Sequence, residues 1–367
     1  MTRVLAVRLD GMGDVLLTGP AVRAIAAGGA PVDFLASGAG APAAAALPGV
    51  SEVIPYDAPW VGAPCDDAFA GELSMLIRRL RGAYDEAVIF TSFHQSPLPA
   101  AMVCRLAGIT RISGTSDAAP GTLLDVRHRR IPPDNSTFQH PNVAVDDDGG
   151  DRGGHEVQAA LRLAAAAGYP LPADDDGLLR LVPARPERLD LPDDYVVVHP
   201  GASVPARALG ADLTRDVVRA LVGSGRRVVL TGDHADRALV RDVLSEGPAA
   251  DVTDLTGRTD LGRLRHVLAG ARAVVVGNTG AAHLAAAVGT PVVSVFTPVV
   301  PAARWRPWGV PHALLGDQRA RCAGSRAREC PVPGHPCMRD VTGATVTAAV
   351  ERLTLGRADS SESLCAS

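Results

Sequence analysis

Short apolar runs rich in valine alternate with longer stretches of helical pattern along nearly the whole chain, and this alternation limits the possible folds more than any other feature. Such runs are typical of buried strands in parallel sheets, and the stretches between them are typical of crossover helices. The expected strands are 3–9, 31–37, 52–56, 86–92, 194–201, 226–232, 251–257, 271–278 and 291–298. The expected helices are 15–27, 69–81, 98–107, 155–168, 212–224, 234–245, 261–269, 279–288 and 345–354. The pattern predicts an α/β fold with doubly wound parallel sheets.

A stretch rich in proline and aspartate, residues 170–194, lies between the two halves and is typical of an interdomain linker. We therefore predict an N-terminal domain over 1–180, a C-terminal domain over 181–355 and a flexible tail over 356–367. Residues 127–154 are expected to form a long irregular loop that faces substrate or moves. Two such domains would share a cleft at the carboxyl ends of their sheets.

Composition narrows the function classes. The chain has 367 residues, 47% of them hydrophobic, and a formal net charge of −4, which argues against a nucleic-acid partner. No apolar run reaches the ~20 residues of a membrane span, and the chain starts directly on a strand pattern. We expect a cytoplasmic monomer, with peripheral membrane contact left open. All 36 basic residues are arginine, so any phosphate must be bound by arginine or main-chain amides.

Three of the six cysteines, Cys322, Cys330 and Cys337, lie close together in the sequence, near His335. Their spacing contains no C-x-x-C pair, so reduced thiols in a compact loop are favoured over a zinc site or a disulfide. The acidic runs 146–148 and 174–176 fall in expected loops rather than at strand ends. We therefore predict no metal site.

The sequence GNTGAAH, residues 277–283, predicts an anion site because it follows an expected strand and opens an expected helix. Asn278, Thr279 and Gly280 would lie at the helix start, and His283 would lie one turn inside it. For Asn278, Thr279 and Gly280 alone, a helix cap followed by a core helix would be the better explanation, but such a helix has no need of the polar His283.

A second small-residue loop, HPGASVPAR at 199–207, follows another expected strand. Its candidate phosphate-binding residues are Ser203 and Arg207. Arg207 could equally be an ordinary solvent-exposed arginine. Two such loops together suit a diphosphate better than either does alone.

Weaker candidates follow two further strands. Thr256 and Gly257 are candidates for a nucleoside pocket, and Asp236 for binding ribose or sugar hydroxyls. Caps of the helices that follow explain these residues adequately.

The sequence VRLDGMGDVLLTGPAVRAI, residues 7–25, reads as a strand end, a turn with two glycines and an amphipathic helix. It lacks the third glycine and the distant acid of a dinucleotide fingerprint. Asp14 follows Gly13 at the expected helix start. Its carboxylate is a candidate for a helix cap and, equally, for a general base that takes a proton from an alcohol.

These motifs together resemble the ADP-heptose-dependent heptosyltransferases of lipopolysaccharide assembly and their relatives, which are inverting glycosyltransferases of the GT-B fold. The resemblance covers nearly the whole chain and rests on 7–25, 155–168, 199–207, 277–296 and 329–342. It implies two facing Rossmann-like domains and no cofactor, with a nucleotide-sugar donor, expected to be an ADP-sugar, as co-substrate. It also implies roles for single residues: Asp14 as base, with Gly13 beside the acceptor; Thr279, Gly280 and His283 on the donor diphosphate; Ser203 and Arg207 in a second phosphate loop.

The chain also departs from that family's pattern. Many heptosyltransferases have aspartate where this chain has Asn278, at a position expected to contact the transferred sugar, so a heptose and a related hexose both stay open. Residues 90–99, FTSFHQSPLP, contribute Ser92, His94 and Gln95 as candidate acceptor contacts; a solvated loop histidine is the alternative.

We expect direct displacement, without a cofactor, onto a hydroxyl of a glycan or a glycosylated small molecule, and we predict that it is metal-independent because no DxD motif lies at a suitable strand end. One alternative is a nucleotide-sugar epimerase of the same fold, which would need a second carboxylate, whereas only Asp14 is clearly placed. Another is a non-catalytic nucleotide-sugar-binding protein, which would bind without turnover.

Overall fold

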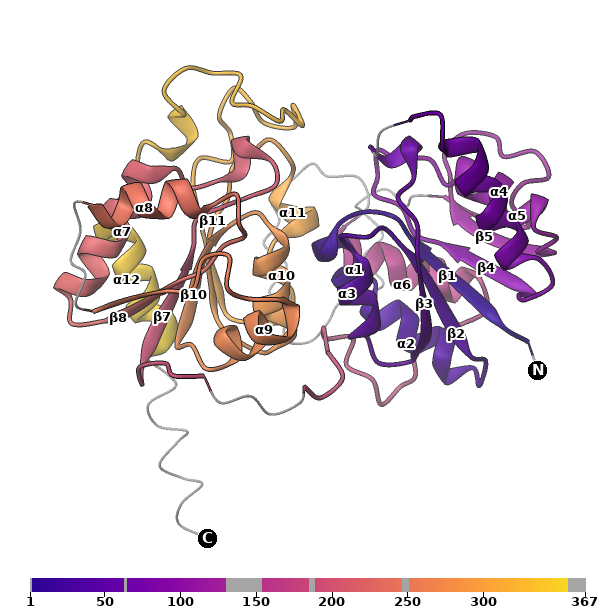
Figure 1. Cartoon of the computed structure of the whole chain (residues 1–367), viewed down its shortest axis with the longest axis horizontal. Coiled ribbons are helices and arrows are strands. Elements are labelled where there is room, and N and C mark those ends of the chain that lie inside the picture. Colours follow the sequence, from indigo (N-terminus) through magenta and orange to yellow (C-terminus); the bar gives the residue numbers. More distant parts are fainter. Residues whose placement is uncertain (1, 63–64, 130–153, 185–188, 246–250, 356–367) are drawn as a thin grey trace, which may run out of the picture. The chain divides into compact units, whose positions relative to one another are not determined.

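The computed structural model describes residues 2–62, 65–129, 154–184, 189–245 and 251–355. The chain divides into two compact units, unit 1 over Met1–Val182 and unit 2 over Pro183–Ser367 (Figure 1). Each unit contains one six-stranded sheet in which all the paired strands run parallel.

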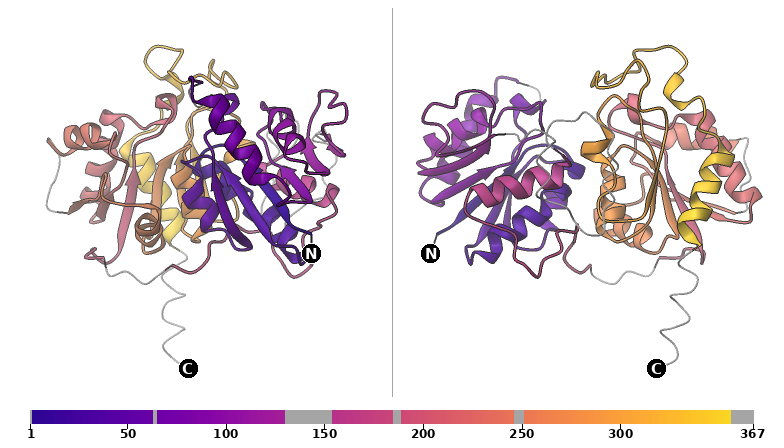
Figure 2. Two further views of the ribbon diagram at one scale, coloured as in Figure 1. Left: turned by 45° about the vertical axis from the view of Figure 1, so that its right-hand side comes forward. Right: turned by 180° about the vertical axis from the view of Figure 1, so that it is seen from behind.

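The elements of unit 1 are β1 (Val4–Arg8), α1 (Met12–Leu17), α2 (Gly19–Ala27), β2 (Val32–Ala36), α3 (Ala41–Ala45), β3 (Val50–Pro55), α4 (Phe69–Leu80), β4 (Glu86–Ile89), α5 (Leu98–Leu106), β5 (Arg111–Thr115), β6 (Val126–His128) and α6 (Glu156–Ala166). A short 3-10 turn covers Pro59–Val61. Helices α4 and α5 pack on one face of the sheet, and the other helices of this unit cover the opposite face (Figures 1 and 2).

The elements of unit 2 are β7 (Tyr195–His199), α7 (Ala211–Gly223), β8 (Arg227–Leu230), α8 (Arg237–Ser245), β9 (Val252–Asp254), α9 (Leu261–Ala269), β10 (Ala273–Gly277), α10 (Gly280–Ala287), β11 (Val292–Val295), α11 (Ala302–Trp305), β12 (His312–Leu315) and α12 (Gly343–Thr354). Two 3-10 turns, Pro205–Arg207 and Pro336–Met338, lie in its loops. Helices α7, α8 and α12 pack on one face of the sheet, while α9 and α10 lie on the other (Figure 2).

Both sheets have the same strand topology. The order is β3-β2-β1-β4-β5-β6 in unit 1 and β12-β11-β10-β7-β8-β9 in unit 2, which is the doubly wound order counted from opposite edges. In such a sheet, the connections leave in opposite directions from two central strands, and a crevice forms at their carboxyl ends. These strands are β1 and β4 in unit 1, and β7 and β10 in unit 2. The topology therefore points to one site position in each unit.

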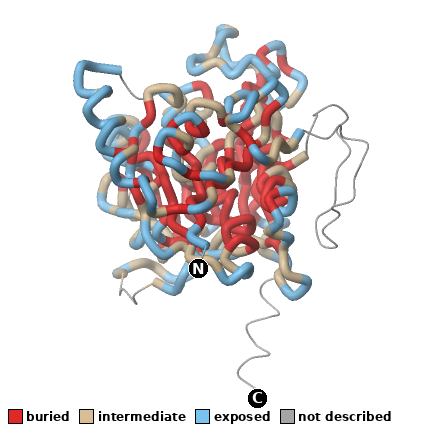
Figure 3. Tube along the Cα trace, turned by 90° about the vertical axis from the view of Figure 1, so that its right-hand side faces the viewer, coloured by how far each residue is buried: buried red, intermediate tan, exposed pale blue. Residues whose placement is uncertain are grey.

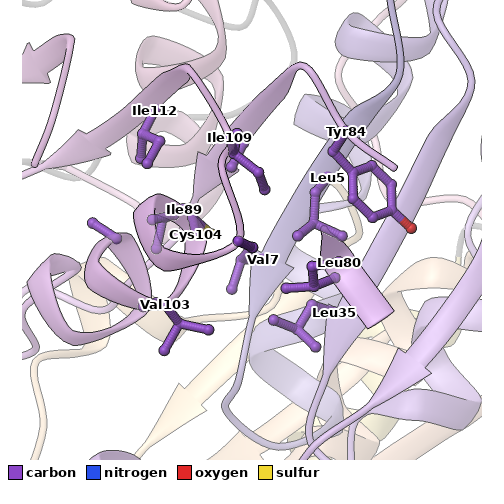
Figure 4. Close-up of a cluster of buried hydrophobic side chains, with 14 of the residues drawn as sticks. Leu5, Val7, Leu35, Leu80, Tyr84, Ile89, Val103, Cys104, Ile109 and Ile112 are labelled. Carbon is purple, nitrogen blue, oxygen red and sulfur yellow. The ribbon is translucent and has the colours of Figure 1, made fainter. Parts of the chain in front are cut away.

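The cores lie between the sheets and their helices. Strands β1, β2 and β10 are buried along their whole length, because helices cover both faces of each sheet. Figure 3 shows this burial along the strands, with exposed residues gathered on helices and loops. In unit 1, Leu5 and Val7 of β1 point toward Leu80 of α4 and Cys104 of α5 (Figure 4).

The predicted helix 15–27 is two helices, α1 and α2, which meet at Thr18. The break has a local cause, because Pro20 lacks an N–H group and is tolerated only in a first helical turn. Strands β5, β6 and β12, and helices α3 and α11, were not expected. Strand β5 contains a serine and a glycine among its five residues, and β6 has only three residues, so neither carries a clear strand pattern.

The stretch interpreted as a linker is only partly separate from the units. Arg23 of α2 forms two hydrogen bonds of 2.7 Å with Asp175, and the main-chain N–H of Val182 donates to the oxygen of Ala46. Residues 170–182 are therefore bound to unit 1. Most of the expected loop 127–154, including 146–148, and the tail 356–367 lie outside the described residues. No helix among the described residues is long and apolar enough to span a membrane.

Candidate functional site

The carboxyl end of β1 contains a buried arginine surrounded by acids. Arg8 is only 3% exposed, and its Nε lies 2.6 Å from Asp10 Oδ2 while its Nη2 lies 2.9 Å from Asp14 Oδ1. Nη2 also donates to Ser92 Oγ at 2.7 Å, and Nη1 lies 3.9 Å from Glu156 Oε2. A planar guanidinium can serve several such partners at once, which a lysine could not do with the same geometry. Arg8 thus joins the loops after β1 and β4 to the start of α6.

Asp14 lies in the first turn of α1 but is not its N-cap. The N-cap is Gly11, and no side-chain cap is formed at this described helix start. The interpretation of Asp14 as a helix cap is therefore wrong. Its carboxylate instead accepts from Arg8, and the side chain is 28% exposed. Its preceding neighbour Gly13 lies in the same turn.

Asp10 is a second carboxylate at the same strand end. Burial raises the pKa of the Asp10 carboxyl, although Arg8 opposes the shift. The Gln95 side-chain amide donates to Asp10, and the Gln95 Oε1 accepts from the main-chain N–H of Ser92 at 2.9 Å.

Reasoning from the sequence missed Asp10, Arg8 and Glu156 as site residues. The one local signal for two of them was the pair of charges, Arg8 and Asp10, at the end of an apolar strand.

A cavity of about 310 Å³ opens beside this cluster, wholly within unit 1. Of the predicted acceptor contacts, His94 and Gln95 line it, whereas Ser92 is buried against Arg8. The lining residues are Val7, Leu9, Asp10, Trp60, Val61, Ile89, Phe90, Thr91, His94, Gln95, Ser96, Pro99 and Ala100. The cavity lies at the ends of β1 and β4, where the topology predicts a crevice.

In unit 2, the loop after β10 has the form of an anion site. Thr279 is the N-cap residue of α10, but its side chain makes no capping hydrogen bond. Asn278 is 5% exposed, and among the described residues neither its Nδ2 nor Thr279 Oγ1 has a hydrogen-bond partner. Buried polar atoms without partners are rare in folded proteins, so these two atoms are unusual. His283 is buried one turn inside the helix, as expected.

The loop after β7 packs directly on the end of β10. A Cβ atom on Gly277 would overlap the main-chain oxygen of Arg207, so the two segments touch only because residue 277 is a glycine. Arg207 is half-buried and Ser203 is exposed. The main-chain N–H of Ala206 donates to the oxygen of Arg328 at 2.9 Å, which attaches this loop to the cysteine-containing segment.

The weaker candidates of unit 2 also lie at strand ends. The Asp236 carboxylate is in van der Waals contact with Gly201 and accepts from the main-chain N–H of Asp233 at 2.9 Å. Burial raises the pKa of Asp236. Thr256 is buried, and its main-chain N–H donates to Asp254 Oδ1 at 2.8 Å. These hydrogen bonds are typical of turns, so a structural role explains part of the contacts of Asp236 and Thr256 without a ligand.

Gly257 has φ +67° and donates through its N–H to the oxygen of Gly232, so it needs the conformational freedom of glycine. His199 is the last residue of β7, and its Nδ1 lies 3.0 Å from Thr231 Oγ1. Burial lowers the pKa of His199 to about 4. The three loops after β7, β8 and β9 are thereby linked to one another.

The cysteines of the described residues are all free thiols. Cys322 and Cys337 are buried, and burial together with the neighbouring Cys322 raises the pKa of Cys337 to about 11. In the described part of the chain, no group of three or more His, Cys, Asp or Glu side chains is arranged to hold a metal ion.

A family model described as glycosyltransferase family 9 (heptosyltransferase) matches residues 74–335. The chain belongs to glycosyltransferase family 9. The family resemblance inferred from the motifs is thereby confirmed. The matched region begins after Asp14, so the family model itself says nothing of the residue predicted to be the base.

Two curated relatives agree with this family assignment. Lipopolysaccharide heptosyltransferase 1 of Pseudomonas aeruginosa is 30% identical over 309 residues, which are 82% of this chain and 79% of the relative. Lipopolysaccharide heptosyltransferase 3 of Escherichia coli K12 is 33% identical over 124 residues, or 33% of this chain. That match spans only about a third (36%) of the relative's length.

Solved structures of the family share the fold. Escherichia coli ADP-heptose lps heptosyltransferase II has a TM-score of 0.70 at 20% identity, with 97% of this chain and 99% of the other covered. Escherichia coli heptosyltransferase WaaC with ADP-2-deoxy-2-fluoro heptose has a TM-score of 0.66 at 21% identity, with 96% and 99% covered. Together with the two parallel sheets, these matches confirm the predicted α/β fold class, GT-B.

Proposed function

We propose that this family 9 glycosyltransferase transfers a sugar, heptose or a related hexose, from an ADP-linked donor to a hydroxyl of a glycan or glycosylated small molecule. The observation that carries the proposal is the pair of strand-end sites: a carboxylate bound by Arg8 in unit 1, and an anion-type helix start in unit 2. The ADP-sugar is favoured because the related WaaC structure contains an ADP-heptose analogue.

In the proposed reaction, Asp14 takes the proton of the acceptor hydroxyl while that oxygen attacks the anomeric carbon. The bond from the anomeric carbon to the diphosphate breaks on the opposite face, and the nucleoside diphosphate leaves with the electron pair. The hydrogen bond from Arg8 orients the carboxylate, and its partial exposure allows an alcohol to reach it.

The leaving diphosphate would be bound in unit 2. Thr279 and Gly280 lie at the start of α10, where the helix dipole favours an anion. Arg207 and His283 add cationic or hydrogen-bonding groups, and Asn278 is the candidate contact of the transferred sugar. Each fixed hydrogen-bond donor of this kind stabilises the charge of a transition state by ~3 kcal/mol.

The isosteric substitution Asp14→Asn tests this proposal. We expect ADP release from ADP-heptose, measured with a hydroxyl-bearing glycan acceptor, to fall ~10²–10⁴-fold, because the amide cannot accept the proton. ADP affinity, measured by calorimetry, should stay within about twofold of the wild type. Near wild-type transfer by Asp14→Asn would remove Asp14 from the role of base.

Two other outcomes would identify the alternative functions. ADP-heptose bound tightly without turnover on any acceptor would favour a non-catalytic binding protein. Release of a free epimerised sugar would favour an epimerase. A chain that binds neither ADP, GDP nor UDP would contradict all three functions.

A further inference from the structure

Helices α4 and α5 expose more large apolar side chains than the rest of the described chain. Of the five such side chains that are exposed among the described residues, Met75 lies on α4, and Met102 and Leu106 lie on α5. Their exposed fractions are 56%, 47% and 53%. The other two, Val182 and Leu355, lie on a loop and at the C-terminal end of α12. Single exposed apolar side chains are ordinary, but a group of them on neighbouring elements indicates an interaction surface.

These three side chains and two arginines lie on a common surface of unit 1. Helices α4 and α5 pack against each other on the same face of the sheet (Figure 1). Arg81 Nη2 donates to the main-chain oxygen of Leu106 at 3.5 Å, so the C-terminal ends of the two helices lie side by side. Residues three or four apart share one side of a helix, which groups Met75 with Arg78 and Arg81, and Met102 with Leu106. We call these five residues, Met75, Arg78, Arg81, Met102 and Leu106, the α4–α5 face.

The α4–α5 face is positively charged, although the whole chain has a formal net charge of −4. Glu72 is the only acid in the sequences of α4 and α5. Arg78 and Arg81 are exposed, and neither forms an ion pair with an acid among the described residues. The neighbouring Arg79 and Arg105 are paired with acids outside the two helices. The face therefore combines apolar side chains with two guanidinium groups that no acid neutralises.

A bilayer surface that contains anionic lipids matches both properties of this face. Exposed methionine and leucine side chains can enter the boundary between headgroups and acyl chains, while planar guanidinium groups bind lipid phosphates. A second copy of the chain fits less well, because a two-fold interface through this face would bring the same arginines of both copies together.

We propose that the α4–α5 face docks the protein on the surface of a bilayer with anionic headgroups. The inference goes beyond the proposed transferase function, since it uses no residue of either strand-end site. Such docking is peripheral and reversible, because it combines a small apolar contact with an electrostatic attraction that salt screens.

Co-sedimentation of the full chain with lipid vesicles tests the proposal. Vesicles of phosphatidylcholine with about 30 mol% phosphatidylglycerol should bind the protein ~10-fold or more tightly than vesicles of phosphatidylcholine alone. Raising the salt to about 0.5 M should weaken binding to the anionic vesicles ~10-fold. Equal binding to both kinds of vesicle, or no binding to either at low salt, would overturn the proposal.

Surface variants locate the contact. Arg78→Gln and Leu106→Ser should each weaken binding to the anionic vesicles about fivefold, through the loss of one charge and of one apolar contact. Met75→Ser is the third variant, in case Leu106→Ser does not fold. The matched controls, Arg241→Gln on α8 and Leu355→Ser at the end of α12, replace exposed residues of unit 2 and should leave binding unchanged. Equal losses in the controls and in the folded variants of the face would contradict the assignment.

Two further measurements on the same samples separate this proposal from the alternatives. Sedimentation velocity without vesicles reports the mass, and a dimer that Met75→Ser and Leu106→Ser dissociate would assign the face to a second copy instead. ADP titration tests the transferase function independently. Vesicle binding without ADP binding would contradict only the proposed transferase, and ADP binding without vesicle binding would contradict only the docking.

Discussion

Arg8 Nη2 lies 2.9 Å from Asp14 Oδ1, so the last residue of β1 binds the carboxylate that follows one turn later in α1. The same guanidinium contacts Asp10, Ser92 and Glu156. Arg8 is thus the central cation of the unit 1 site, and it positions Asp14 without any need to touch a substrate itself.

Replacing Arg8 with methionine should destabilise the protein by roughly 3–5 kcal/mol, because the half-buried Asp10 and the buried Glu156 would lose the charge of the Arg8 guanidinium. The free energy of unfolding in urea measures the effect. Arg79→Met is the matched control, since Arg79 pairs with Glu52 on the surface and its loss should cost less than ~1 kcal/mol. Equal effects of the two substitutions would show that Arg8 is not the centre of a buried network.

Replacing Thr279 with valine should weaken ADP binding about fivefold, the equivalent of one hydrogen bond of ~1 kcal/mol. Stability should change little, because Thr279 Oγ1 has no hydrogen-bond partner among the described residues. Calorimetry with ADP and a thermal melt of the same sample give the two values. A large loss of stability with unchanged ADP affinity would mean that the hydroxyl is structural.

Replacing Gly277 with alanine should destabilise unit 2 by about 1–3 kcal/mol, because the added methyl would overlap the main chain at Arg207. ADP affinity should fall as well, since the loop carrying Arg207 must move. Gly223→Ala at the end of α7 is the control, as nothing lies near its added Cβ, and it should leave stability unchanged or raise it by up to ~1 kcal/mol. Chemical denaturation measures both variants, and a harmless Gly277→Ala would disprove the close packing.

His199 should make unit 2 less stable in mild acid. Its pKa falls from an ordinary 6.5 to about 4 on burial, so the unfolded chain binds a proton more readily than the folded chain does. The contribution of neutral His199 is complete above pH 6.5 and is lost as the pH falls toward 4, up to about 3 kcal/mol in all. The difference in unfolding free energy between wild type and His199→Gln, measured at several pH values, isolates this residue. A difference independent of pH over that window would show that His199 titrates normally.

Much of the architecture follows from local patterns. The positions of the central strands were predicted correctly from the sequence. Residues such as Val196 and Val275 belong to continuous apolar runs, which a strand buried on both faces requires. Of the four edge strands, β6 and β12 were missed; β6, with three half-buried residues, carries almost no such signal. Helix starts at α10 and α12 were likewise close to their expected positions.

The sequence by itself determined the alternation of strands and helices, the glycine turns after β1 and β10, and hence the family resemblance, because all of these are encoded in short stretches of chain. Only the tertiary structure decided which charges meet. Arg8 looks like an ordinary strand residue and Glu156 like a helix start, yet residues 8, 92 and 156 come together through the crossover order of the sheet. No local pattern carries such a contact, because pairing in a parallel sheet joins segments far apart in the chain and the desolvation that makes these charges interact strongly exists only after folding.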